Sequence, residues 1–404
     1  MRVLCAFCKH QYGAKERGVG IEYESFIPAL RRLGHDVRHF ETWDQSLYPT
    51  YADLNRALLA EVESYQPDIV FTVQRDYEIW TETLAAIREL DRVTLVTWTT
   101  DDSFKFHMVS KFIGPYYDAI STTYEYRVPD YKAAGIDGVY CTQWAANSHW
   151  LNPPKLAQDC KYGVSFIGAS YGARAAVVEK LRGSGVTVEC FGFGWPNGSI
   201  PTDKIPTVMH DSVISLNFSA GFKSDAGNDR QIKARTFEVP GAGGFLLTDA
   251  VPELESVYRL GQEIEVYDGY DELESKIRYY LQNPCERDRI AQAGYLRTAS
   301  SHTYEQRLDG LLRFALERRT LRSEKRSCTV PATGGVAGKG LPSPKLGVVL
   351  RGLRWGLVKV CRMIWGTDRG PNAARRLVFE ISRKTCGERT FNAESIPGRM
   401  FPYV

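Results

Sequence analysis

Short apolar runs that alternate with amphipathic stretches, in two successive series, constrain the fold of this 404-residue chain most strongly. The apolar runs of the first series, predicted as strands, are residues 2–7, 36–40, 68–73, 93–98, 119–122 and 139–142. The stretches with helical periodicity between them are residues 21–33, 52–64 and 80–90. Strands that alternate with helices form βαβ units around a parallel sheet. The first series therefore predicts an α/β domain over residues 1–155.

A second series with the same alternation starts near Tyr162 and predicts a second α/β domain over residues 156–320. Its predicted strands are residues 162–168, 186–192, 212–218 and 244–249. Its predicted helices are residues 173–182, 230–239, 270–281 and 286–299, and a long amphipathic helix from His302 that we expect to pass back over the first domain. Two such domains in tandem predict a cleft between the carboxyl ends of two sheets, where open α/β folds bind ligands.

The composition is that of a soluble globular protein, with 43% hydrophobic and 25% charged residues. No stretch reaches the roughly 18 uninterrupted apolar residues of a membrane span, and the first apolar run ends at Lys9 and His10, too early for a secretory signal. We therefore expect a cytoplasmic protein. The nine scattered cysteines indicate free thiols. Cys5 and Cys8 form a CxxC without a second pair at zinc-site spacing, so buried strand thiols are favoured over a metal or redox pair.

The end of the chain differs in composition. Residues 321–345 are rich in Pro, Gly and Ser, which predicts a flexible linker before a basic tail, residues 346–404. Residues 345–389 hold eleven Lys/Arg against three Asp/Glu. In residues 346–365, one apolar stripe at helical spacing consists of Leu346, Val349, Leu350, Leu353, Leu357, Val360, Cys361 and Ile364.

A basic amphipathic helix of this kind, with Trp355 and Trp365, favours peripheral binding to an anionic membrane through residues 346–389, at the inner face of the plasma membrane. The alternative is that the stripe packs on the body of the protein and that Arg351, Arg354, Lys359 and Arg362 are solvated. Nucleic acid is not expected as a partner, because these cations have no interleaved aromatic residues to stack on bases.

The segment KARTFEVPGAGGFLLTD, residues 233–249, combines two cations, a carboxylate and a glycine cluster. Asn228 or Asp229 is a candidate N-cap for the predicted helix 230–239, and Pro240 and Gly241 end that helix. The glycines therefore predict a sharp exit from the helix into a buried strand, not a phosphate-binding loop.

Cations gather at the start of this predicted helix. The N-terminus of a helix carries partial positive charge, to which Arg230, Lys233 and Arg235 add full charges, so the segment predicts an anion site that needs no metal. Glu238, one turn beyond Arg235, is placed to accept two hydrogen bonds from a ribose diol while the cations hold a diphosphate. The alternative is a solvated helix with an Arg235–Glu238 surface pair.

The motif RxFExPxxGxFLLT, residues 235–248, together with residues 251–308, resembles the C-terminal half of the CgeB-like glycosyltransferases of the GT-B fold, with a group 1 type C-terminal domain. Residues 20–37, 96–104, 117–136 and 142–150 resemble the acceptor-side domain of the same family, so the resemblance covers about residues 1–316. It implies two Rossmann-like domains that face each other across a cleft, with a nucleotide diphosphate sugar bound as co-substrate by the second domain.

The resemblance also implies roles for single residues. Glu238 corresponds to the second glutamate of an E-x7-E motif that holds the donor ribose, whereas the first position is Arg230 here, which leaves donor identity and a retaining mechanism open. The predicted donor-binding residues are Gly168, Tyr171, Arg174, Phe191, Trp195, Asn217, Arg230, Lys233, Arg235 and Glu238. Among them the aromatic rings are candidates for stacking on the base and Arg174 for contact with the diphosphate.

On the acceptor side, Asp101 and Asp102 directly follow the run VTLVTWTT, residues 93–100, and His107 lies close by. Asp102 is a candidate base and, with Arg235, a candidate catalytic residue; helix capping is the alternative. The predicted reaction is metal-independent sugar transfer to a saccharide or lipid-linked glycan in bacterial surface polysaccharide assembly. The alternatives are a nucleotide-sugar epimerase of the same architecture and a non-catalytic membrane-attached scaffold.

Overall fold

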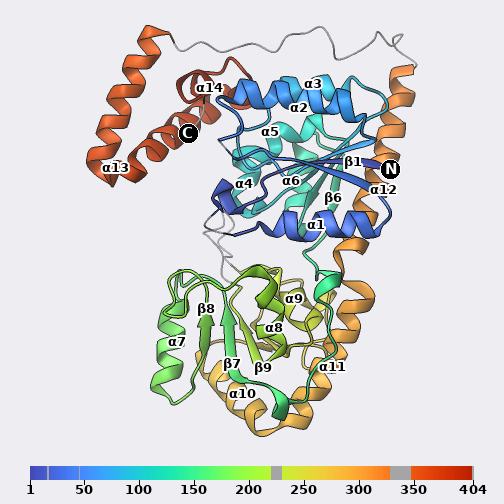
Figure 1. Cartoon of the computed structure of the whole chain (residues 1–404), viewed down its shortest axis with the longest axis vertical. Coiled ribbons are helices and arrows are strands. Elements are labelled where there is room, and N and C mark those ends of the chain that lie inside the picture. Colours follow the sequence, from blue (N-terminus) through green and yellow to red (C-terminus); the bar gives the residue numbers. More distant parts are fainter. Residues whose placement is uncertain (16–17, 45, 220–229, 328–346, 403–404) are drawn as a thin grey trace. The chain divides into compact units, whose positions relative to one another are not determined.

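The computed structural model describes residues 1–15, 18–44, 46–219, 230–327 and 347–402. Contacts divide the chain into two compact units, which Figure 1 shows with their sheets and helices. Unit 1 comprises Met1–Thr142 and Asp309–Val404, and unit 2 comprises Gln143–Leu308. Residues 143–155, predicted as the end of the first domain, thus group with unit 2, where backbone bonds such as Asn152 N to Gly241 O hold them.

Unit 1 contains a six-stranded parallel sheet in the order β2-β1-β3-β4-β5-β6. Its strands are β1 (Arg2–Ala6), β2 (Asp36–Phe40), β3 (Ile69–Thr72), β4 (Thr94–Trp98), β5 (Ala119–Thr122) and β6 (Val139–Cys141). All six coincide with predicted apolar runs. Every residue of β3 and β4 is buried, as expected for strands covered on both faces.

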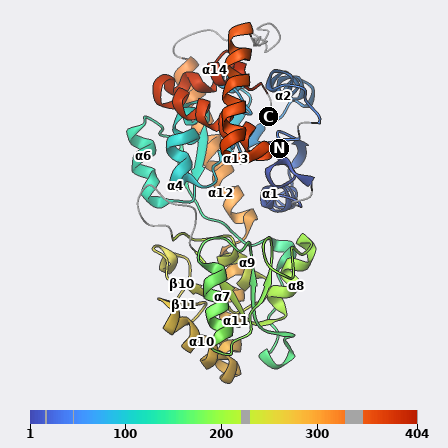
Figure 2. The same cartoon turned by 90° about the vertical axis from the view of Figure 1, so that its left-hand side faces the viewer.

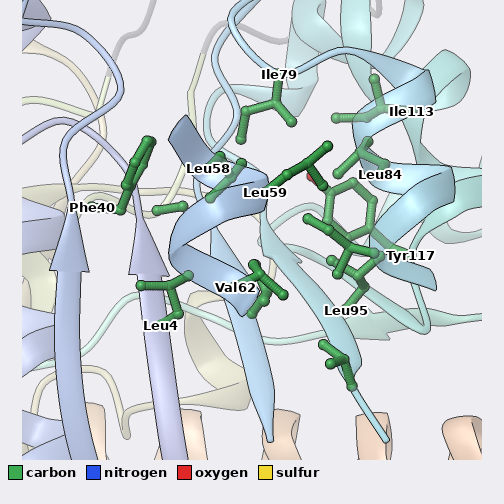
Figure 3. Packing of buried hydrophobic residues seen from close by; sticks show 14 of the residues in the cluster. Leu4, Phe40, Leu58, Leu59, Val62, Ile79, Leu84, Leu95, Ile113 and Tyr117 are labelled. Carbon is green, nitrogen blue, oxygen red and sulfur yellow. The ribbon is translucent and has the colours of Figure 1, made fainter. Parts of the chain in front are cut away.

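Helices cover both faces of this sheet. They are α1 (Ile21–Arg32), α2 (Tyr51–Tyr65), α3 (Thr81–Arg88), α6 (Val128–Ala133), and α4 (Asp102–Lys105) and α5 (Lys111–Ile113) joined by a π-helical turn. Figure 3 shows α2 packing Leu58 and Val62 against Leu4 of β1. Residues four apart lie on one helix face, and burying each such side chain is worth about 2 kcal/mol, so this face holds α2 on the sheet.

Unit 2 contains a five-stranded parallel sheet in the order β11-β10-β9-β7-β8. Its strands are β7 (Tyr162–Ile167), β8 (Glu189–Phe191), β9 (Ser212–Asn217), β10 (Leu246–Asp249) and β11 (Glu265–Tyr267). Its helices are α7 (Arg174–Gly183), α8 (Ile205–His210), α9 (Arg235–Gly241), α10 (Tyr270–Gln282) and α11 (Pro284–Ser301). The edge strand β11 was not predicted, because its short sequence carries little periodicity.

Helix α9 begins at Arg235, five residues later than predicted. The backbone N–H of Gln231 donates to Ser219 O at 3.3 Å, so this part of the chain runs along the end of β9 instead of coiling. The candidate caps Asn228 and Asp229 lie outside the described residues. The predicted glycine exit is confirmed: Gly243 has φ of +79°, and a Cβ there would lie 2.4 Å from Asn152 O.

Helix α12 (Tyr304–Ser327) continues past residue 320, so the predicted linker begins too early. Its second half is fastened to unit 1 by arginines. Arg319 donates to the carbonyl oxygens of Asp91 and Arg92, and Arg322 forms a buried ion pair with Asp118 at 3.0 Å. Leu, Arg, Lys and Glu, which dominate this segment, are good helix formers, and these contacts hold the helix on unit 1. The remainder of the predicted linker, residues 328–345, lies outside the described residues.

The tail forms α13 (Val348–Cys386) and α14 (Ile396–Met400), which lie together on unit 1 (Figure 2). Gly366, with φ of +84°, interrupts α13 and bends it. None of the helices in the described ranges is both long and apolar enough to cross a bilayer. Cys5 and Cys8 are buried free thiols, and burial raises the pKa of both, as expected for cysteines of a core strand.

Candidate functional site

The carboxyl ends of β7, β9 and β10 bring several predicted donor-binding residues together in unit 2. Gly168 follows β7, Asn217 ends β9 and Asp249 ends β10, and these strands are neighbours in the sheet. The carboxylate of Asp249 accepts hydrogen bonds from Ser219 N at 2.7 Å and Ser219 Oγ at 2.5 Å, which fixes the start of the loop after β9. Neither of these two residues was predicted, although Asp249 ends a buried strand, as a site residue in this fold class commonly does.

Arg174 is the first residue of α7, and its side chain is held in one position. The guanidinium donates to the carbonyl oxygens of Ala169 and Phe218, each at 3.1 Å, and to Tyr171 Oη at 2.9 Å. It also lies over the ring of Tyr171, 3.9 Å from the centroid. Arg174 forms no ion pair with a carboxylate of the described residues. Burial lowers the pKa of Arg174, and the contact with Tyr171 partly opposes that shift.

Arg235, the first residue of α9, lies near Arg174, and its positive charge contributes to the lowered pKa of that guanidinium. Within the described ranges, the Arg235 side chain makes no hydrogen bond and no ion pair, and its Nε is buried without a partner. Two like charges held close together repel each other, and a bound anion would remove that repulsion. The pair is therefore a candidate receptor for an anion such as a diphosphate.

Glu238 lies one turn beyond Arg235 and is only 6% exposed. Its carboxylate has no hydrogen-bond partner in the described parts of the chain, although buried carboxylates are normally hydrogen-bonded. Burial raises the pKa of Glu238, and the charge of Arg235 partly opposes that shift. The alternative of a solvated Arg235–Glu238 surface pair is wrong, because Glu238 is buried and the two side chains form no ion pair.

The two other predicted cations are less suited to hold a ligand. Arg230 precedes α9 and is exposed; it donates to Ala250 O at 3.2 Å and lies 3.4 Å from Asp268 Oδ1. Lys233 is half-buried in the turn before α9. The predicted cluster of three cations on one helix is therefore reduced to Arg235 on the helix, with Arg174 contributed by α7.

In the segment after β8, the aromatic residues that are exposed differ from those predicted to stack on a base. Phe191 is half-buried and packs against Tyr162, and Trp195 donates from Nε1 to Gly168 O at 2.7 Å. Both rings therefore serve the packing of unit 2, which corrects their predicted role in stacking on a base. Phe193, which was not predicted, is 83% exposed. Ser170 N donates to Phe193 O at 2.9 Å, so the exposed rings of Tyr171 and Phe193 lie on adjoining loops.

Close approach of these two loops explains their glycines. Gly192 has φ of +136°, and a Cβ there would lie 2.4 Å from Gly168 O.

Asn217 is buried and donates from Nδ2 to Thr248 Oγ1 at 3.0 Å, which links β9 to β10. Asn217 therefore orders the carboxyl end of the sheet. A cavity of about 370 Å³ in unit 2, bordered by Tyr162 and Arg278, opens at the opposite, amino end of β7 and holds none of these residues.

In unit 1 the structure separates the two predicted aspartates. Asp102 is fully buried and accepts hydrogen bonds from Thr99 Oγ1 at 2.7 Å, Ser110 Oγ at 2.6 Å and Tyr131 Oη at 2.6 Å. Burial raises the pKa of Asp102, and these hydroxyls oppose the shift. The predicted role of Asp102 as an acceptor-side base is corrected, since its carboxylate is enclosed by its own donors and organises the start of α4.

Asp101 is the acceptor-side carboxylate that stays available. It is half-buried at the end of the β4 segment and has φ of +56°, an unfavourable conformation for a residue other than glycine. Its carboxylate forms no hydrogen bond or ion pair to any residue in the described ranges. His107 is exposed, with Nε2 3.4 Å from the Arg127 guanidinium, so its ring belongs to the surface around Arg127.

Comparisons with known proteins bear on the resemblance and on the fold. Residues 174–313 match a family described as glycosyl transferase-like, a range that includes Arg174, Arg235 and Glu238. The chain is similar to the spore protein CgeB of Bacillus subtilis (strain 168), with 22% identity over 270 residues, 61% of this chain and 83% of that protein. These findings confirm the resemblance inferred from the sequence.

Solved structures share the fold. The chain is similar to sucrose-phosphate synthase from Thermosynechococcus elongatus, with a TM-score of 0.54, 11% identity and coverage of 81% of this chain and 100% of that one. It is also similar to Anabaena HepE in complex with UDP-glucose, with a TM-score of 0.51, 12% identity and coverage of 80% and 100%. A glycosyltransferase from Rickettsia africae ESF-5 has a TM-score of 0.51, 14% identity and coverage of 78% and 98%. The predicted GT-B fold with two parallel sheets is confirmed.

Proposed function

We propose, from the premise that this chain has the family and fold of a GT-B glycosyltransferase, that it transfers a sugar from a nucleotide diphosphate sugar to an acceptor hydroxyl. The observation that carries the proposal is the Arg174–Arg235 pair beside the unpaired carboxylate of Glu238. In transfer, the bond between the anomeric carbon and the diphosphate oxygen breaks, and negative charge develops on the departing diphosphate. Two guanidinium groups held ready in unit 2 would stabilise that charge without a metal.

Each donor-site residue then has a part in binding. Arg174, already fixed by carbonyl oxygens, and Arg235, whose guanidinium has no protein partner in the described ranges, would hold the diphosphate. Glu238 would accept hydrogen bonds from the ribose hydroxyls, which supply the partners its carboxylate lacks. The exposed rings of Tyr171 and Phe193 would stack on the base, because an aromatic face open to solvent is available for that contact.

The proposed acceptor and place of the reaction rest on unit 1 and on the tail. We place the acceptor hydroxyl near Asp101, whose unpaired carboxylate can receive its proton or hold it in position. A saccharide or lipid-linked glycan of a bacterial surface polysaccharide is the proposed acceptor, consistent with the basic tail that we expect at the inner face of the plasma membrane. A UDP-sugar is the first donor to test, since UDP-glucose is bound in the similar structure of HepE.

A panel of UDP-, GDP- and dTDP-sugars tests the proposal. We expect one donor to release nucleoside diphosphate at a rate that rises on addition of an oligosaccharide or glycolipid acceptor. An epimerised donor without nucleotide release would favour the epimerase, and no binding of any donor would favour the non-catalytic scaffold. Either result would contradict sugar transfer. Binding measured by calorimetry, before turnover is examined, separates a missing donor from a missing acceptor.

Replacing Asp101 with asparagine should lower the acceptor-dependent rate about tenfold, because a hydrogen bond to a charged group is worth roughly 1.5 kcal/mol. Slow hydrolysis of the donor by water should stay unchanged, since the donor residues lie in unit 2. The matched variant is Asp102→Asn, which we expect to lower the melting temperature through the buried hydroxyl cluster. Equal acceptor-dependent rates for wild type and Asp101→Asn would exclude Asp101 from the acceptor site.

A further inference from the structure

Helix α13 is divided by its bend at Gly366 into two parts with different surroundings. The second part is fixed to unit 1, and we call residues 367–401 the anchor. Phe379 packs against Tyr77 with ring centroids 5.2 Å apart, and Arg375 donates to Tyr51 Oη at 3.1 Å. The first part, residues 348–365, is called the arm.

One edge of the arm packs on the anchor. Leu350, Leu357 and Cys361 contact a small core formed with Ala374 and Phe401. At 100° per residue these three arm positions fall within an arc of about 40°. Through this edge, which accounts for three residues of the single apolar stripe read from the sequence, the arm packs on another part of the tail. The alternative of packing on the body stays a prediction.

The other edge of that stripe is uncovered. Val349, Leu353, Val360 and Ile364 are 76%, 60%, 47% and 62% exposed. Their spacing places them within an arc of about 60° on the helix, next to the packed edge. Isolated exposed apolar residues are common, but a continuous row of four on one helix marks an interaction surface.

Charge shows what kind of partner this row fits. The arm carries Arg351, Arg354, Lys359 and Arg362, and residues 347–367 contain no Asp or Glu. Arg351, Lys359 and Arg362 fall within about 80° of one another, on the face of the helix opposite the exposed row. A helix with an apolar row on one face and cations on the opposite face matches a lipid surface with anionic headgroups. A second copy of the chain fits poorly, because two arms of this charge would repel each other.

We propose that the arm docks unit 1 on an anionic lipid bilayer, with Val349, Leu353, Val360 and Ile364 in the acyl boundary and the long side chains of the opposite, cationic face reaching the headgroups. The anchor joins the arm to the core around Tyr77. Lipid contact through the arm would therefore attach unit 1 as a whole to the bilayer. The inference does not depend on sugar transfer. Along one edge the apolar stripe packs on the anchor, and along the other edge it would bind lipid.

Co-sedimentation of the full chain with vesicles tests the proposal. Wild type should bind vesicles of phosphatidylcholine with phosphatidylglycerol, should bind phosphatidylcholine alone far less, and should be released in about 0.5 M salt, which screens the headgroups. Leu353→Glu with Ile364→Glu should lower the bound fraction at least about tenfold, because both charges enter the acyl boundary. The matched control is Leu156→Glu with Leu296→Glu, two exposed leucines of unit 2 with the same charge change, which should bind almost as wild type does.

The experimental results that would contradict the lipid-docking proposal can be told apart. Wild type that does not bind anionic vesicles, or equal binding by wild type and Leu353→Glu with Ile364→Glu, would exclude a lipid-docking arm. A dimer in sedimentation velocity that this variant dissociates, without vesicle binding by wild type, would assign the row to a second copy instead. Both substitutions are at exposed positions, so an unchanged melting curve and donor binding will show that the variant is folded.

Discussion

Replacing Arg235 with alanine is expected to lower kcat/KM for sugar transfer about a hundredfold, which corresponds to roughly 2.7 kcal/mol of transition-state stabilisation. The guanidinium makes no hydrogen bond or ion pair within the described residues, and it lies beside the like charge of Arg174. Its removal should therefore leave the melting temperature unchanged or slightly higher. A loss of turnover without a loss of stability would indicate that the guanidinium serves the ligand and not the folded structure.

The matched control is Arg182→Ala. Arg182 lies in the same unit, is exposed and pairs with Glu179, so its loss removes the same charge at the surface and should change turnover little. Arg235→Lys should recover part of the lost rate, because it restores the charge without the forked geometry. Unchanged turnover in Arg235→Ala would show that the diphosphate does not bind at this end of α9.

Replacing Glu238 with glutamine should raise the donor KM between about tenfold and a hundredfold, because a charged acceptor of the ribose hydroxyls is lost. The same change should stabilise the unliganded protein at neutral pH. Burial raises the pKa of Glu238 above its ordinary value of 4.5, so between the two values the folded protein binds the proton more strongly than the unfolded chain does. The stability contributed by that proton is present below pH 4.5 and is lost as the pH rises through the folded pKa.

Melting curves as a function of pH therefore provide a second readout. Glu238→Gln should melt higher than wild type near pH 7 and close to wild type at pH 4, and saturating donor should reduce or reverse the difference at pH 7. The control is Glu255→Gln, an exposed glutamate of unit 2, which should change neither donor KM nor the melting curve. A wild-type donor KM in Glu238→Gln would show that the buried carboxylate does not hold the ribose.

Local periodicity carried most of the fold prediction. The strands of both sheets, apart from β11, coincide with apolar runs, because a strand buried on both faces must be apolar along its length. Arg235 and Glu238 could also be proposed as site residues, since a cation and a carboxylate one turn apart before a buried strand form a local pattern. The start of α9 could not, because the chain before it bonds to Ser219, which is distant in sequence.

Tertiary contacts decided which polar and aromatic groups stay available for a ligand. Asp101 and Asp102 are adjacent in sequence, yet only Asp102 is enclosed, by hydroxyls that include that of Tyr131, 29 residues away. Trp195 similarly bonds to Gly168, 27 residues away, and leaves Phe193 as the exposed ring.

The amino-acid order by itself determined two parallel-sheet domains, a candidate anion site at the start of α9 and a basic amphipathic tail, because each depends on side-chain patterns within a few turns or one strand. Only the tertiary structure decided which carboxylate is unpaired, that Arg174 of α7 completes the cation pair, and which edge of the arm is exposed. The physical reason is that a hydrogen bond or an apolar contact needs two partners, and for these groups the second partner comes from a distant part of the chain.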